Sequence, residues 1–426
     1  MSDLAHDEPP ATATLPARTD VVVVGGGLAG LAAARLLQRD GHSVVVLDAQ
    51  RAGGRGATDE RAGFLFNRGP HALYLGGPAE RVLAELGVRP AGGRAGSGAC
   101  GLLGERVAPL PAGPLSLLRT PLLGWRGKLA VGRLMNGLSG LRAEGLGGLS
   151  FGEWLDGRRL PADARALVET VARVATYSNA PAIASSDMVV GQMQMALGAG
   201  VRYVHGGWQT IVDALAEGLT VRRATVVAVR GDSGSPVVEM ADGTHIVAHA
   251  VVVAVGTPAV AATLLGRPAF DVGPPIEAAC LDLGTTVASE PALLLGIDQP
   301  LYLSNHCPPA RLAPAGSSVV HVARYLAPGE HTEPHAQRQQ LEAHAARAGI
   351  GAEQIVERRY LHRMTVAGAL AVAAHGGLSG RPGVGDTGVG GAFLAGDWVG
   401  PTGHLLDASL ASAAVAAERA GRLVSR

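Results

Sequence analysis

Three glycines near the start of the chain have the spacing of a phosphate-binding turn. Gly25, Gly27 and Gly30 form G-x-G-x-x-G directly after the valine run at residues 21–24. Such a run is typical of a strand buried on both faces, and the Ala/Leu-rich residues after the glycines have helical propensity. The first glycine would make the tight turn, the second would expose bare backbone to a phosphate, and the third would let helix and strand approach closely. The positive end of the helix would hold the phosphate charge.

An acidic residue follows at the spacing that a dinucleotide requires. Residues 42–48 are predicted to form a second strand that ends at Asp48, roughly 20 residues after the glycines. A carboxylate there accepts hydrogen bonds from ribose hydroxyls and repels a 2′-phosphate. Because a chain with 61 glycines produces such spacings by chance, the prediction depends on this strand–turn–helix–strand context. The residues predicted to bind the dinucleotide here are Gly25, Gly27, Leu28, Ala29, Gly30, Asp48 and Ala49.

A second glycine-rich segment distinguishes a flavin from a nicotinamide. Gly53, Gly54 and Arg55 follow Asp48 closely, and residues 63–67 then lead to a turn at Gly69, Pro70 and His71. The glycine pair permits another close approach to the cofactor, and the Arg55 guanidinium is a forked donor for phosphate or ribityl oxygens. A plain nicotinamide domain does not need this second clamp.

In this order of motifs the chain resembles the FAD-dependent amine oxidase and phytoene desaturase superfamily, with the phytoene desaturase-like branch favoured. The resemblance implies FAD as the cofactor, contacted at its adenine by the backbone of Val226. It further implies that Gly396 and Asp397 bind the pyrophosphate and ribityl region. The helix after them would direct its N-terminus at flavin N1 and O2, where reduced flavin is negatively charged.

The predicted C-terminal helix begins among Leu406, Asp407 and Ala408, which we expect to bind the cofactor. Asp407 or Ser409 would cap this helix, and the Asp407 carboxylate would fold onto the N–H groups of its own helix. Some members of the superfamily attach FAD through a cysteine shortly before the Gly-Asp strand. Residues 308–396 contain no cysteine, so we predict non-covalent FAD.

The strand–turn–helix–strand pattern predicts an α/β fold, and the resemblance implies two domains. We expect a Rossmann-type FAD-binding domain (GR2-like) over residues 20–80, 204–265 and 385–426, after a disordered lead-in over 1–19. An inserted α+β substrate domain with a mixed sheet and helices would cover 81–203 and 266–384. Residues 79–87, 150–200, 209–219 and 332–348 are predicted helical, with Ser150 as an N-cap, whereas the Gly/Ala/Pro-rich stretch up to residue 114 is predicted irregular.

Composition excludes several classes of protein. The formal net charge is zero, which gives no reason to expect nucleic acid as a partner. Three widely separated cysteines have no metal-ligand spacing, so no metal site is predicted, and they suit a reduced, cytoplasmic compartment. No apolar run is long enough to suggest a membrane-spanning helix.

Residues 115–141 permit two interpretations. Leucines and Trp125 alternate there with Arg119, Arg126, Lys128 and Arg133. Such a basic amphipathic segment can lie on a membrane surface, which would make the protein membrane-peripheral. The interpretation we favour is that these are ordinary half-exposed helices of the substrate domain.

Two enzymatic functions fit the sequence. The favoured one is transfer of a hydride from an apolar, isoprenoid- or polyene-like substrate to flavin N5, because the only lysine, Lys128, is misplaced for the lysine that many amine oxidases hold near N5. The alternative is oxidation of a small amine or amino acid; a non-enzymatic flavoprotein is the third. His71 and His404 are the candidate catalytic groups, with backbone-bonded loop histidines as the competing interpretation.

Overall fold

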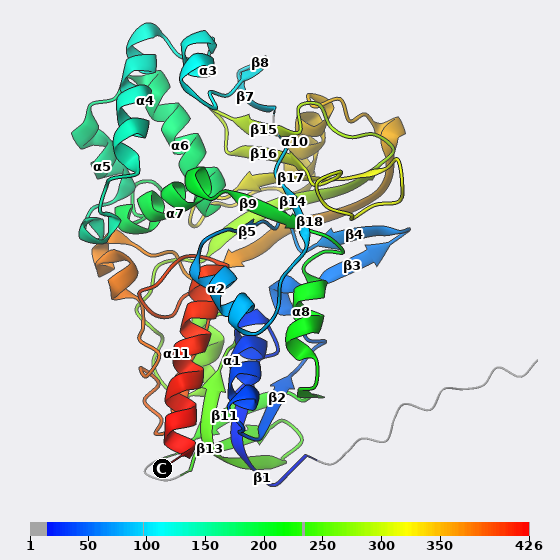
Figure 1. Cartoon of the computed structure of the whole chain (residues 1–426), viewed down its shortest axis with the longest axis vertical. Coiled ribbons are helices and arrows are strands. Elements are labelled where there is room, and N and C mark those ends of the chain that lie inside the picture. Colours follow the sequence, from blue (N-terminus) through cyan, green and yellow to red (C-terminus); the bar gives the residue numbers. More distant parts are fainter. Residues whose placement is uncertain (1–14, 97, 232–234, 426) are drawn as a thin grey trace, which may run out of the picture.

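The computed structural model describes residues 15–96, 98–231 and 235–425, so most of the predicted lead-in lies outside the described residues. The chain forms two lobes, each built around a seven-stranded sheet. Figure 1 shows the lobe that holds the first strand and the last helix below the lobe that holds the long helices of the middle of the chain. The predicted α/β class with an inserted second domain is confirmed.

The sheet of the lower lobe is mainly parallel. Its order is β10-β2-β1-β13-β12-β11, and β19 pairs with the last residues of β13. The first four strands and β19 pair in parallel, and β12 and β11 extend the sheet as antiparallel strands. Residues 21–24 of β1 are buried, as a central parallel strand requires. The bounds are β1 (Arg18–Val24), β2 (Val44–Asp48), β10 (Thr220–Arg223), β11 (Val226–Arg230), β12 (Val237–Met240), β13 (His245–Val253) and β19 (Ala392–Leu394).

Two long helices lie side by side against this sheet, α1 (Leu28–Arg39) and α11 (Leu406–Val424) (Figure 1). Their buried faces are rich in alanine, which allows the helices to approach closely. The flanking helices are α2 (Pro78–Glu85), α8 (Gln209–Ala216) and α9 (Pro258–Leu264). Both long helices begin next to the point where parallel strands end, which is where an α/β sheet binds its ligand.

The sheet of the upper lobe is mixed, with the order β18-β14-β17-β16-β15-β7-β8. Only the β15–β7 pair is parallel. Helix α10 (Pro334–Ala346) packs against this sheet. The strands are β7 (Ala99–Leu103), β8 (Arg106–Pro109), β14 (Ile276–Thr285), β15 (Leu293–Gly296), β16 (Leu301–Asn305), β17 (Ser318–Tyr325) and β18 (Ile355–Ala367).

Helices complete the upper lobe, and short strands connect the lobes. The helices are α3 (Pro114–Arg119), α4 (Trp125–Leu138), α5 (Phe151–Arg158), α6 (Ala162–Thr176) and α7 (Ser186–Gly198). The connecting strands are the hairpin β3 (Thr58–Arg61) and β4 (Phe64–Asn67), and a small sheet of β5 (Leu73–Tyr74), β6 (Gly92–Arg94) and β9 (Val201–Val204).

The structure differs from the sequence prediction at two places. The stretch before residue 114 is not wholly irregular but contains β6, β7 and β8, because pairing with distant strands orders it. The long strand β18 was not predicted.

Ser150 is confirmed as an N-cap: its hydroxyl accepts from Glu153 N at 3.2 Å. The strands of both sheets fall within the ranges predicted for the two domains, except that β1 begins at Arg18, and the domain division itself stays a prediction.

Candidate active site

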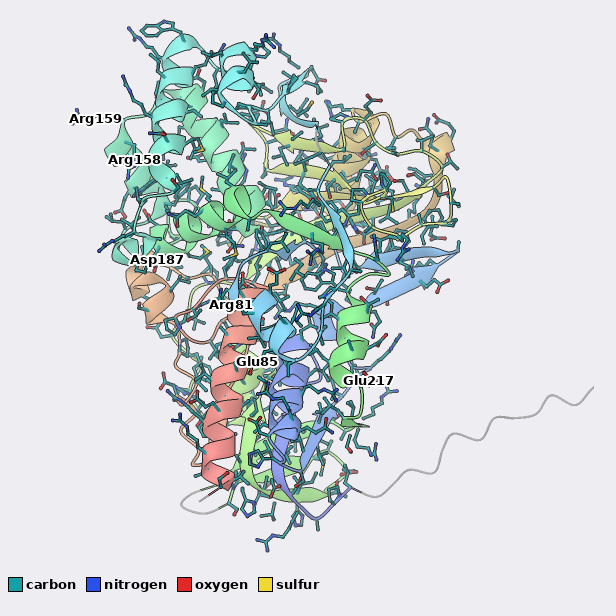
Figure 2. The ribbon with its side chains drawn as sticks, viewed as in Figure 1. Arg81, Glu85, Arg158, Arg159, Asp187 and Glu217 are labelled. Atoms are coloured by element: carbon teal, nitrogen blue, oxygen red, sulfur yellow. The ribbon has the colours of Figure 1, made fainter. Side chains whose placement is uncertain are left out.

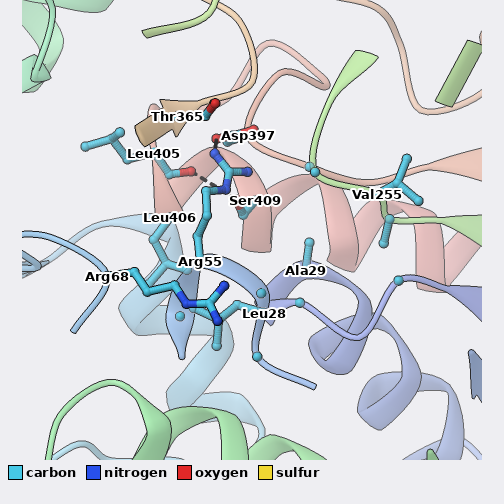
Figure 3. A pocket seen from close by; sticks show the side chains of 18 of the residues that line it. Leu28, Ala29, Arg55, Arg68, Val255, Thr365, Asp397, Leu405, Leu406 and Ser409 are labelled. Atoms are coloured by element: carbon cyan, nitrogen blue, oxygen red, sulfur yellow. Dashed lines mark hydrogen bonds and ion pairs between the residues drawn. The ribbon is translucent and has the colours of Figure 1, made fainter. Parts of the chain in front are cut away.

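One cavity of about 710 Å³ collects most of the predicted site residues. Its walls come from the β1–α1 turn, the segment after β2, the β4–β5 turn, the end of α6, strand β18 and the start of α11, so both lobes contribute. Figure 3 shows Arg55, Arg68 and Leu406 grouped around it, with Asp397 beside Arg55. The predicted residues that line the cavity are Gly25, Gly27, Leu28, Ala29, Asp48, Ala49, Gly53, Gly54, Arg55, Pro70, His71, Val226, Gly396, Asp397, Leu406 and Asp407.

The three glycines of the first turn have distinct roles in the structure. Gly25 has a φ of +108°, and a Cβ there would lie 2.5 Å from Ala254 O. A Cβ on Gly30 would lie 1.9 Å from Gly25 O, so only glycine lets α1 approach this turn. A Cβ on Gly27 would meet nothing within 4 Å. Gly27 therefore presents open backbone to the cavity at the uncapped N-terminus of α1, as a pyrophosphate would need.

The second glycine segment runs alongside the first turn. Gly53 N donates to Gly26 O at 2.8 Å, and Gly27 and Gly53 form an isolated parallel bridge. The Asp48 carboxylate accepts from Gly26 N at 2.6 Å and from Gln50 N at 2.7 Å. This acid therefore holds both glycine segments in place at the end of β2, where a ribose would reach it.

Arg55 and Asp397 join the two ends of the chain. Arg55 Nη1 lies 2.6 Å from Asp397 Oδ2 and also donates to Val366 O at 2.9 Å (Figure 3). Asp397 is buried at 3% exposure and accepts from Gly368 N as well. Burial alone would lower the pKa of Arg55, but the charge of Asp397 and the hydrogen bond to it raise that pKa above its ordinary value. The pair fixes the guanidinium on the cavity wall.

The start of α11 differs from the prediction. Its N-cap is Leu405, with φ +52°, and no side chain caps the helix. The Asp407 carboxylate does not fold onto its own helix but accepts from Ala79 N at 2.7 Å, at the first turn of α2. The N-cap of α2 is Gly77, which has no side chain to accept this hydrogen bond, and Pro78 has no N–H, so Asp407 supplies the missing oxygen. Burial raises the pKa of Asp407 to about 6.

His71 lies on the cavity wall as a neutral ring. Its Nδ1 is 2.9 Å from Gly69 O, and its ring centroid is 4.6 Å from that of Trp208. Burial lowers the pKa of His71 to about 4, although the hydrogen bond to Gly69 opposes the shift. With Nδ1–H donating to this carbonyl, Nε2 is left as a hydrogen-bond acceptor at neutral pH.

Arg359 of β18 holds the hairpin that leads to His71. Its guanidinium donates to Asp282 Oδ2 at 2.6 Å, to Asp59 Oδ2 at 2.7 Å and to the carbonyl of Asn67. The Asn67 carbonyl also accepts from Gly69 N at 2.7 Å. The upper sheet therefore positions the β4–β5 turn through one buried arginine.

Asp282 also belongs to a buried trio of possible metal-ligating groups. The ligand atoms of Cys280, Asp282 and His321 lie within 4.8 Å of one another. Asp282 Oδ1 already accepts from Cys280 Sγ at 3.1 Å and lies 2.5 Å from His321 Nδ1, and Oδ2 is engaged by Arg359. The carboxylate is thus committed to protein partners, and we interpret the trio as a structural hydrogen-bond network.

Four predicted residues do not line the cavity: Gly30, Gly69, Ala408 and His404. Gly30 and Gly69 act through close approach, since a Cβ on Gly69 would lie 2.5 Å from Met364 Cε. His404 is buried, its Nε2 lies 3.0 Å from Thr176 O, and burial lowers its pKa to about 4. His404 therefore has the hydrogen bond to a backbone carbonyl that the alternative, non-catalytic interpretation of this residue predicted.

Several charged or sulfur-containing side chains of the upper lobe lie away from the cavity. Asp187 of α7 accepts from Leu378 N at 2.9 Å, and Figure 2 shows it at the edge of the helical part of the upper lobe. Arg324 pairs with Glu330, and Arg363 pairs with Glu277. The methionines Met188 and Met193 are core residues.

Sequence reasoning missed several lining residues: Arg68, Tyr74, Tyr177, Met364, Thr365 and Leu405. Tyr177 ends α6 with φ +58° and donates its hydroxyl to Pro70 O at 2.9 Å, so it reaches the cavity from 107 residues away. Arg68 directly precedes the predicted Gly69–His71 turn. That neighbourhood was the only feature of the sequence that could have indicated a place for Arg68 in the site.

A family model described as flavin containing amine oxidoreductase matches residues 28–290, which is more than half of the chain. The chain belongs to this family. The match begins at the first residue of α1 and includes the second glycine segment, the β4–β5 turn and the strands β10 to β13. The predicted superfamily is therefore confirmed, and with it a flavin as the cofactor class of the family.

Individual relatives match over shorter segments. A putative flavin-containing monoamine oxidase of Mycobacterium tuberculosis is 47% identical over 77 residues, which cover 17% of this chain and 16% of that protein. A phytoene desaturase of Cercospora nicotianae is 38% identical over 71 residues, covering 16% of this chain and 11% of the relative. The matches thus span less than a fifth of the length of these relatives, and they include both oxidase and desaturase names.

A solved structure shares the whole fold. Wild-type putrescine oxidase bound to putrescine superposes with a TM-score of 0.72 at 18% sequence identity, covering 96% of this chain and 99% of that one. At this identity the likeness establishes the fold alone. Within the described residues, no helix is long and apolar enough to cross a membrane.

Proposed function

We propose that this chain is an FAD-dependent oxidoreductase that takes a hydride from a carbon of a small-molecule substrate. The observation that carries the proposal is that Gly27, Arg55 and Asp397, from segments far apart in the sequence, line one cavity. FAD is favoured over a shorter flavin because the same cavity continues to Asp48 and Val226, where an adenosine would lie. When bound, the isoalloxazine would supply the hydride acceptor at N5.

The chain's own residues divide the work of holding the cofactor. The N-terminus of α1 and the backbone of Gly27 would bind the pyrophosphate, and Asp48 would bind the adenosine ribose. The Arg55–Asp397 pair would orient the ribityl chain. The N-terminus of α11 would stabilise negative charge on the reduced ring, and the Asp407 carboxylate, turned towards Ala79, leaves that helix end uncapped.

We propose that the FAD is held non-covalently. The three cysteines of the chain are Cys100, Cys280 and Cys307, and the residues that line the cavity include none of them. Acid precipitation of the purified protein should therefore leave the flavin in the supernatant. Flavin that stayed with the polypeptide would contradict this.

For the substrate we propose an uncharged, apolar molecule of isoprenoid or polyene type, which undergoes dehydrogenation. Outside the cofactor cradle, the wall consists mainly of aromatic and apolar side chains, together with the neutral His71 and the guanidinium of Arg68. Burial raises the pKa of Tyr74 and of Tyr177, so both are neutral phenols. The carboxylates in the lining are Asp48, Asp397 and Asp407, and each already accepts hydrogen bonds within the protein.

Oxidation of a small amine is the second candidate. It is supported by the monoamine oxidase among the relatives and by the aromatic side chains of Tyr177 and Trp208 at the cavity. Such a substrate would bind as the neutral amine, because the wall offers an ammonium no unengaged carboxylate among its described lining residues.

Anaerobic mixing separates the two candidates. The purified holoprotein is mixed with a panel of amines and with a panel of isoprenoid or polyene compounds, and the oxidised flavin band is followed. Bleaching by the apolar panel alone is the expected result, and bleaching by amines alone would establish the alternative. A protein that purifies colourless and does not bind added FAD would overturn both.

A further inference from the structure

The far end of the upper lobe exposes large apolar side chains. Leu115 and Leu118 of α3 are 60% and 68% exposed, and Trp125 and Leu129 of α4 are 69% and 52% exposed. In Figure 1 these helices lie at the end of the molecule opposite the lower lobe. We call these four residues, with the neighbouring Arg119, Arg126, Lys128 and Arg133, the α3–α4 surface.

The fold holds these side chains outward. No residue of α3 is buried, whereas α4 buries Val131, Leu134 and Leu138 on its opposite face. Lys128 Nζ donates to Leu118 O at 2.7 Å and so ties the end of α3 to α4. The exposed apolar residues of the α3–α4 surface are therefore not part of the core. They lower the solubility of the protein and do not stabilise its fold.

The segment that carries this surface has charges of one sign. From residue 106 to residue 143 the sequence has no Asp or Glu and six basic residues: Arg106, Arg119, Arg126, Lys128, Arg133 and Arg142. Among the acids on adjoining elements, only Asp163 lies at the start of α4, and the others described here are paired with arginines. Asp163 of α6 accepts from Gly124 N at 2.7 Å, Asp156 and Glu169 pair with Arg165, and Glu105 pairs with Arg347.

We propose that the α3–α4 surface docks this protein on an anionic lipid bilayer. Trp125 and the leucines would enter the interface between headgroups and acyl chains, and the arginines would contact the phosphates. An anionic bilayer offers apolar depth and negative charge over the same area, which matches both properties of the surface. A second copy of the chain would instead bring two sets of basic residues together, so the charge pattern disfavours self-association.

Vesicle sedimentation of the full-length holoprotein tests this directly. Vesicles of phosphatidylcholine are compared with vesicles that also contain phosphatidylglycerol, at low and at high salt. The expected result is binding to the anionic vesicles that weakens strongly with salt, because the exposed charges are screened. Binding to neither vesicle at low salt would overturn the proposal.

A matched pair of variants locates the surface. Leu129→Ser removes an apolar side chain that is 52% exposed on the α3–α4 surface, and Leu197→Ser removes one that is 54% exposed at the end of α7. Leu129→Ser should weaken vesicle binding by about tenfold, whereas Leu197→Ser should leave it unchanged. Equal effects of the two variants would contradict the assignment.

A second pair of variants tests how much the basic residues contribute to vesicle binding. Arg126→Glu on α4 should weaken binding to anionic vesicles by roughly tenfold, because each basic residue near an anionic surface contributes favourably. Arg89→Glu makes the same change at an exposed position of the lower lobe and should have little effect. Unchanged circular dichroism and flavin absorbance confirm that the variants fold. If the wild type instead forms dimers that Leu129→Ser abolishes, the surface is an interface between copies and the membrane proposal fails.

Discussion

At the scale of single residues, the Arg55–Asp397 pair joins parts of the chain that are 342 residues apart. Arg55→Met would leave the Asp397 carboxylate, 3% exposed, without its cation. Breaking a buried pair by removing one partner costs several kcal/mol, and the partial exposure of Arg55 reduces this. We expect Arg55→Met to lower the free energy of unfolding by about 2–3 kcal/mol in denaturant titrations.

Two further variants show whether the lost charge pair is responsible. Arg68→Met removes the other arginine of the cavity wall, for which the described residues offer no ion pair, and should change stability by less than about 0.5 kcal/mol. Arg55→Met combined with Asp397→Asn should be more stable than Arg55→Met alone, because no buried charge is left without a partner. Additive losses in the double variant would contradict this account.

Asp407 gives the protein a pH dependence of definite sign. Its pKa in the folded chain is about 6, above the ordinary value of an aspartate. The folded state therefore binds this proton more tightly than the unfolded state. The contribution to stability is complete below about pH 4 and is lost as the pH rises through about 6. Asn at this position still accepts from Ala79 N but carries no charge.

The expected result is that Asp407→Asn gains stability relative to the wild type by about 2–3 kcal/mol between pH 4 and pH 7.5. Unfolding titrations of both proteins at the two pH values measure this difference. Comparing the two proteins cancels the opposite contributions of His71 and His404, whose pKa values burial lowers. A difference that is independent of pH would show that Asp407 titrates normally.

At the scale of elements, two glycines of the β1–α1 turn have different roles. We expect Gly30 to matter for folding and Gly27 for cofactor binding. A Cβ on Gly30 would lie 1.9 Å from Gly25 O, but a Cβ on Gly27 would meet no protein atom within 4 Å. Gly30→Ala should therefore destabilise the chain by several kcal/mol or prevent folding. Gly27→Ala should fold with nearly unchanged stability as the apoprotein and lose at least tenfold in FAD affinity, measured by flavin fluorescence. Equal FAD affinity for Gly27→Ala and wild type would place the pyrophosphate elsewhere.

The elements also show what could be predicted from the sequence. Gly25, Gly30, Asp48 and Arg55 act within a short stretch of chain, so their spacing is sufficient to assign them to one turn. Asp407 has its partner, Ala79, 328 residues away, and its sequence neighbours suggested a cap on its own helix instead. An acid at the second residue of a helix can accept a hydrogen bond from its own helix or from a neighbouring one, and the sequence does not distinguish the two.

Tertiary pairing explains the elements that were missed. Strand β18 is held by β14 and contributes Met364 and Thr365 to the cavity, but its own residues alternate poorly between buried and exposed. Likewise, the exposed leucines of the α3–α4 surface have the same spacing as core leucines. Only the structure shows which way they face.

At the scale of the whole molecule, both lobes line the cavity, so the cofactor should stabilise them together. Addition of FAD to apoprotein at about 100 times its dissociation constant should add roughly 2.7 kcal/mol to the stability of the folded state. We expect the thermal transitions of both lobes to rise, followed by circular dichroism and by tryptophan fluorescence. Gly27→Ala, which we expect to bind FAD at least tenfold more weakly, should gain at most about 1.4 kcal/mol at the same concentration. A shift of the lower lobe's transition alone would show that the upper lobe does not take part in binding FAD.

The order in which the cavity is assembled along the chain also affects how the protein is made in the cell. The wall begins at Val24 and is complete only at Ser409. During synthesis, the ribosome releases the β1–α1 turn early but releases α11, whose N-terminus we propose to face the flavin ring, late. If the proposed cofactor site is correct, capture of the flavin waits until almost the whole polypeptide has emerged, and we expect a chain that ends before Gly396 to be unable to retain it.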